Sequence, residues 1–164
     1  FKGVKKMTII IIGETQIHCD RISVVDGHMI ECPSKIVTGP DFVWGFCGHS
    51  PSPKMEAAGT IDELVTAYKE EADLRAGNGD QILLSHGGNL WHGGYCQGEG
   101  RDFFLTRTLT GSAIGSYAVE WYNFKRSLVG FSLPIDRAAQ AFVRRVSCLW
   151  GSEDDDPCVS MSLR

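Results

Sequence analysis

The chain has 164 residues, a formal charge of −4 at pH 7 and an apolar content of 43%. This length suits one domain with a substantial core, and an acidic chain without a basic face argues against a nucleic-acid partner. No apolar run approaches the roughly 20 residues that span a bilayer, so we expect a protein without membrane association.

The six cysteines are scattered along the chain, with no Cys-x-x-Cys pair. This usage is typical of a reducing compartment, where cysteine packs as a small apolar residue, so we expect a cytoplasmic protein. The five histidines also fall singly, and none forms a ligand pair at helical spacing. The acidic run at 153–156 lacks the ligand spacing of a calcium loop. We therefore expect no metal and no cofactor.

The chain opens with a predicted hairpin. Four isoleucines, residues 9–12, predict a buried strand, and residues 17–21 predict its antiparallel partner after a short polar turn. This pairing places Asp20 opposite Ile9. Thr8 then precedes a strand whose antiparallel neighbour carries the acid-base pair Asp20-Arg21. An N-terminal nucleophile needs such an arrangement, because its hydroxyl attacks while its own α-amine accepts the proton.

The rest of the chain alternates strands with amphipathic helices. We predict strands over 28–32, 35–37 and 42–47, a helix with a capping box at 60–63, strands over 81–85, 89–95 and 102–107, helices that begin near 112 and after 134, and a last strand over 158–163. Two apolar antiparallel sheets each need cover on both faces. We therefore predict an α+β fold, a four-layer αββα sandwich with the sheets inside and the helices outside.

Five short motifs follow one another along this element order: Thr8-Ile9-Ile10, Asp20-Arg21, Lys35-Ile36, Gly48 and Gly111-Ser112. Together they resemble the proteasome β-subunit family of N-terminal-nucleophile (Ntn) hydrolases, and within it the bacterial HslV-like peptidases. The resemblance runs over nearly the whole chain, from the first strand to the last. It implies a threonine peptidase that hydrolyses peptide bonds in unfolded polypeptides.

The resemblance also assigns roles by position. Thr8 matches the nucleophile, which becomes terminal if the chain is cut after Met7. Residues 1–7 are then an N-terminal extension or propeptide-like segment, and residues 8–164 form a single domain. The family further implies a homo-oligomer that encloses its sites, with an ATPase unfoldase as a further expected partner.

Four more residues complete the site that the resemblance implies. Asp20 matches the acid of the second strand, and Lys35 matches the lysine that pairs with it. The ammonium lowers the pKa values of the hydroxyl and the amine, while the carboxylate keeps the lysine charged. Gly48 matches the glycine whose backbone N–H stabilises the oxyanion. Ser112 matches the serine that hydrogen-bonds near the terminal amine.

Departures from the family pattern leave other interpretations open. The family has an aspartate at the end of the last helix, whereas residues 146–151 read Val-Ser-Cys-Leu-Trp-Gly and Ser152 only roughly matches the serine that follows. We also predict one helix, not two, between Gly48 and Gln81. The alternative is a catalytically silent member that acts as an assembly or binding module. A third interpretation is an unrelated four-layer amidohydrolase that uses another N-terminal residue.

Overall fold

The computed structural model describes residues 8–32, 34–48, 51–74, 80–95 and 103–164. The predicted extension over residues 1–7 lies outside this part of the chain. Within it, no helix combines the length and the apolar character that a membrane span requires.

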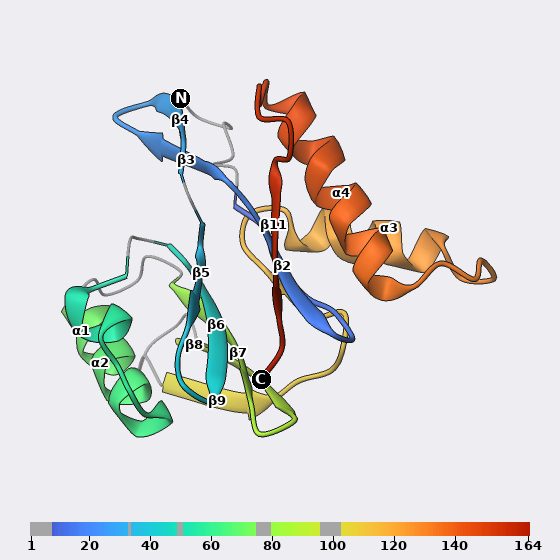
Figure 1. Cartoon of the computed structure of the whole chain (residues 1–164). Coiled ribbons are helices and arrows are strands. Elements are labelled where there is room, and N and C mark those ends of the chain that lie inside the picture. The colour runs from blue at the N-terminus through green and yellow to red at the C-terminus, as the bar shows by residue number, and fades with distance from the viewer. Residues whose placement is uncertain (1–7, 33, 49–50, 75–79, 96–102) are drawn as a thin grey trace.

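Two antiparallel sheets form the centre of the molecule (Figure 1). The four-stranded sheet has the order β10 (Ala113–Ile114), β1 (Ile10–Ile12), β2 (Gln16–Asp20) and β11 (Cys158–Ser162). The five-stranded sheet has the order β5 (Ile36–Thr38), β6 (Phe42–Cys47), β7 (Gln81–His86), β8 (Asn89–Tyr95) and β9 (Phe103–Arg107). A separate two-stranded hairpin consists of β3 (Ile22–Val25) and β4 (His28–Glu31).

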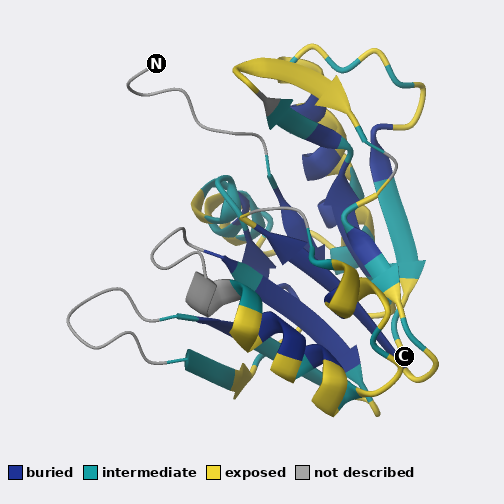
Figure 2. Cartoon of the chain, turned by 90° about the vertical axis from the view of Figure 1, so that its left-hand side faces the viewer, coloured by how far each residue is buried: buried dark blue, intermediate teal, exposed yellow. Residues whose placement is uncertain are grey.

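Helices cover the outer face of each sheet. The five-stranded sheet is covered by α1 (Pro53–Glu56) and α2 (Ile61–Leu74), and the four-stranded sheet by α3 (Ala118–Ser127) and α4 (Ile135–Leu149). Three apolar clusters fill the three spaces between these layers. Figure 2 shows the buried strands inside and the exposed residues on the outer helices. The predicted α+β sandwich of antiparallel sheets is thus confirmed.

The run of four isoleucines is explained by this layering. Alternate residues of a strand point to opposite faces of its sheet. Ile9 and Ile11 pack against the helices, while Ile10 and Ile12 pack between the sheets, and all four are fully buried. Burying each such side chain stabilises the fold by about 1.5–3 kcal/mol. A sheet covered on both faces therefore needs an unbroken apolar run.

The first hairpin has the predicted register. Ile10 pairs with Cys19, and the backbone N–H of Asp20 donates to the carbonyl of Ile9 at 3.3 Å. Asp20 consequently lies level with the start of β1.

Three predictions of secondary structure were wrong. The helix predicted to begin near residue 112 begins only at Ala118, as α3. Residues 113–114 instead form strand β10, because pairing with the edge of β1 prevails there over the local helical pattern. Two helices, not one, lie between Gly48 and Gln81, because Ser52 caps the short helix α1 by accepting from the N–H of Met55. The hairpin β3–β4 includes a strand that was not predicted.

A polar network around the buried His18 ties the first hairpin to α4. The His18 ring nitrogens bond to Asp136 Oδ1 at 2.8 Å and to Ser160 Oγ at 2.7 Å. The backbone and side chain of Thr15 donate to the other Asp136 oxygen, each at 3.0 Å. Burial lowers the pKa of His18 below its ordinary value, although Asp136 acts in the opposite direction. His18 therefore connects β2 to β11 through Ser160 and to the start of α4 through Asp136, which also binds the turn at Thr15.

Candidate functional site

The Asp20 carboxylate is the centre of the candidate site. Its side chain is fully buried at the end of β2. Oδ1 accepts the backbone N–H of Ile9 at 3.0 Å. Oδ2 accepts the N–H of Ile22 at 2.9 Å and the ammonium of Lys35 at 2.7 Å. Burying a carboxylate is costly unless hydrogen bonds and an opposite charge compensate it, and here both compensations are present.

The ion pair joins the two sheets. Asp20 ends β2 in the four-stranded sheet, whereas Lys35 immediately precedes β5 in the five-stranded sheet. The Lys35 side chain is only 12% exposed. The same carboxylate also accepts the N–H of the peptide between Thr8 and Ile9. The Lys35 ammonium and the start of β1 are therefore both bound to Asp20.

Thr8 lies just before β1 and is held from its other side by the loop after β10. Its backbone N–H donates to Ser116 Oγ at 3.1 Å, and its carbonyl accepts the N–H of Tyr117 at 3.3 Å. Gly115 has φ +108°, and a Cβ there would lie 2.3 Å from the carbonyl oxygen of Thr8. Only glycine therefore lets this loop approach Thr8 so closely.

Ser112 does not lie beside Thr8, and this prediction of its position was wrong. Its carbonyl accepts the N–H of Ile12, at the opposite end of β1, and its hydroxyl bonds to Thr108 Oγ1. Ser116 occupies the predicted place instead. Both serines follow a glycine, at 111–112 and at 115–116, and the helix predicted from residue 112 favoured the first of these two pairs.

Gly48 follows β6 and has φ +119°. The register of β5 and β6 pairs Ile36 with Gly45, so Gly48 lies at the same end of the sheet as Lys35. A Cβ at Gly48 would lie 1.8 Å from Asp80 Oδ1. Both the backbone conformation and the space therefore require glycine, and its successors 49–50 lie outside the described residues.

The end of α4 supports the loop that holds Thr8. The indole N–H of Trp150 donates to the hydroxyl of Tyr117, and the two rings meet edge to face with centroids 6.4 Å apart. Ser152 is directed elsewhere, since its hydroxyl donates to Glu31 on β4 at 2.9 Å. The C-terminal end of α4 thus contributes an aromatic contact through Trp150, and Ser152 a link to the hairpin.

The nearby cysteines are poor nucleophiles. Burial raises the pKa of the Cys19 thiol and of the Cys47 thiol to about 12, and only the thiolate is a strong nucleophile. Among the described residues, no three potential ligands gather closely enough to hold a metal ion. The chemistry available here is that of a hydroxyl, an ammonium and backbone N–H groups.

No protein-family model and no curated protein sequence matches the chain. Solved structures share its fold. Thiobacillus denitrificans BPH in complex with epoxomicin is similar with a TM-score of 0.58 and 11% identity, over 96% of this chain and 100% of that chain. Thiobacillus denitrificans BPH is similar with a TM-score of 0.57 and 11% identity, over 96% of this chain and 99% of that chain. At this identity the likeness shows the fold alone.

Proposed function

We propose that the chain is a proteasome-like threonine peptidase that uses Thr8 as an N-terminal nucleophile. The observation that carries the proposal is the Asp20 carboxylate, which binds both the peptide that follows Thr8 and the ammonium of Lys35. A charged amine held within the fold at the start of a strand is suited to activating a hydroxyl and an α-amine.

The reaction begins after cleavage between Met7 and Thr8. The Thr8 hydroxyl oxygen attacks the carbonyl carbon of a peptide bond, and its proton passes to the free α-amine. The Lys35 ammonium lowers the pKa of the Thr8 hydroxyl and of the Thr8 α-amine. The Ser116 hydroxyl hydrogen-bonds to the nitrogen of Thr8. The backbone N–H of Gly48 stabilises the oxyanion. The leaving amine takes the proton, and water then hydrolyses the acyl ester on Thr8.

Two further observations support the proposal. The fold is shared along 96% of the chain with a protein whose structure contains epoxomicin, so epoxomicin is a suitable probe for Thr8. The described cysteines are free thiols, which fits the cytoplasmic location expected from the sequence. We propose unfolded polypeptides as substrates, a homo-oligomeric assembly and an ATPase unfoldase as a further partner.

A second candidate is a catalytically silent member of the same fold, acting as an assembly or binding module. The observation that favours it is the end of α4, where Trp150 contacts the Thr8 loop and residues 146–151 include no aspartate. A site without this carboxylate lacks one of the groups that the family uses to orient its nucleophile.

Chain length provides the test. A chain that begins at Thr8 should take up epoxomicin and hydrolyse short apolar peptides, whereas one that begins at Phe1 should do neither. The reason is that an amide nitrogen at Thr8 cannot accept a proton at neutral pH. Intact-mass spectrometry of both chains, with Thr8→Ala as control, measures the labelling. Equal labelling of both lengths would reject Thr8 as the nucleophile, and labelling of neither, with the fold intact, would favour the silent member.

A further inference from the structure

The two outer helical layers carry opposite charges. Helix α2 has five acidic residues and one basic residue, in order Asp62, Glu63, Lys69, Glu70, Glu71 and Asp73. Helix α4 has one acidic and three basic residues, in order Asp136, Arg137, Arg144 and Arg145. These helices cover opposite outer faces of the sandwich (Figure 1). The outer surfaces of α2 and α4 are therefore complementary in charge.

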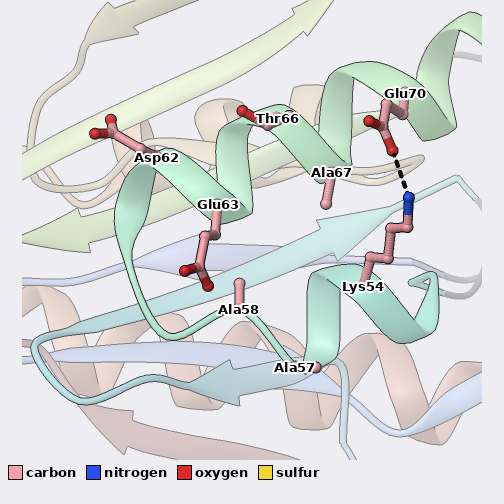
Figure 3. A pocket seen from close by; sticks show the side chains of 8 residues that line it. All are labelled: Lys54, Ala57, Ala58, Asp62, Glu63, Thr66, Ala67 and Glu70. Carbon is pink, nitrogen blue, oxygen red and sulfur yellow. Dashed lines mark hydrogen bonds and ion pairs between the residues drawn. The ribbon is translucent and has the colours of Figure 1, made fainter.

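The acidic face contains a groove of about 520 Å³ between α1 and α2 (Figure 3). Its apolar lining includes Ala57, Ala58 and Ala67, and its acidic lining includes Asp62, Glu63 and Glu70. Lys54 pairs with Glu70 at 3.2 Å, which neutralises one end. Asp62 forms no ion pair with any described residue, so the other end is left negative. The groove thus combines apolar and acidic lining residues.

The basic face offers such a combination. Arg145 and Leu149 lie four residues apart on α4 and therefore project from the same side of the helix. Leu149 is 78% exposed, and Arg145 is exposed and forms no ion pair within the described part of the chain. Its neighbour Arg144 is instead engaged by Asp156 at 3.4 Å. Arg145 is thus available to a partner, next to an apolar side chain that gains by burial.

We propose that a second copy of this chain occupies the groove: Leu149 of one protomer packs on the alanines of the next, and Arg145 pairs with Asp62. The contact is heterologous because it joins different faces, so repetition gives a closed ring or an open chain according to the rotation per step. This contact rests on the homo-oligomer proposed above and specifies which surfaces of the chain form it. The contact does not require an active Thr8, so its test is independent of the peptidase activity.

Charge exchange between two variants tests this contact. Self-association of the full chain is measured by sedimentation velocity at low and high salt. It should weaken with salt, and Arg145→Glu or Asp62→Arg should each weaken it at least about tenfold, because like charges then meet. Mixing the two variants should restore association, since every contact in the mixture can again pair opposite charges. Leu149→Ser should weaken it without changing the charge.

The matched control is Arg107→Glu on β9, which makes the same charge change as Arg145→Glu at a residue that neither lines the groove nor belongs to α4. It should associate like the parent chain, and the thermal midpoint of each variant should stay near that of the parent. Strictly monomeric behaviour at low salt would overturn the proposal. So would association that ignores both charge reversals, failure of the mixture to associate, or equal weakening by Arg107→Glu, which would attribute the effect to net charge.

Discussion

Replacing Lys35 with methionine should destabilise the fold and abolish any peptidase activity. The Lys35 ammonium lies 2.7 Å from Asp20, whose side chain is fully buried. Removing one partner of a buried ion pair leaves an uncompensated charge and costs about 3–5 kcal/mol. Asp20 keeps two backbone N–H donors, so we expect the lower end, about 3 kcal/mol. For a domain of this size that lowers the thermal midpoint by about 6–12 °C.

A double-mutant cycle separates this charge effect from lost packing. Asp20→Asn removes the charge but keeps one oxygen acceptor, so the double variant with Lys35→Met should be more stable than Lys35→Met alone. The free energy of unfolding of the three variants and the parent is measured by urea denaturation at pH 7. A loss below about 1 kcal/mol for Lys35→Met would refute the reasoning, because exposed ion pairs contribute no more than this. Additive effects in the cycle would also contradict the described pair.

Three further predictions concern the hydroxyls, the loop and the buried histidine. In a chain that begins at Thr8, Ser116→Ala should reduce any peptidase activity, whereas Ser112→Ala should leave it nearly unchanged. A peptide-hydrolysis assay compares the two variants, and a larger loss in Ser112→Ala would contradict the assignment of Ser116 as the serine beside Thr8. Gly115→Ala should destabilise by about 1–3 kcal/mol, because φ is positive and the added Cβ meets the Thr8 carbonyl; urea denaturation measures this, and a neutral effect would count against the close approach. The pKa of His18 is lowered by burial, so the unfolded chain binds its proton more readily, and stability should fall as pH decreases below about 6.5; urea denaturation across this range should show a flatter profile for His18→Gln.

The sequence alone determined much of the first hairpin, because its information is local. Four consecutive β-branched isoleucines before a short polar turn favour a strand covered on both faces, and the turn length fixes the register that sets Asp20 level with Ile9. The same apolar patterns predicted the two covered sheets. The glycine at position 48 was also correctly placed at the end of its strand.

Only the tertiary structure decided which serine meets Thr8. The Gly-Ser pairs at 111–112 and 115–116 flank β10, and pairing of β10 with β1 places Ser112 at one end of β1 and Ser116 at the other. The contact between Asp20 and Lys35 likewise depends on how two separate sheets stack. Strand order and sheet stacking are set by burial summed over the whole chain, which no short motif contains. The sequence therefore identified the anchoring pair by resemblance, while packing determined the loop that completes the site.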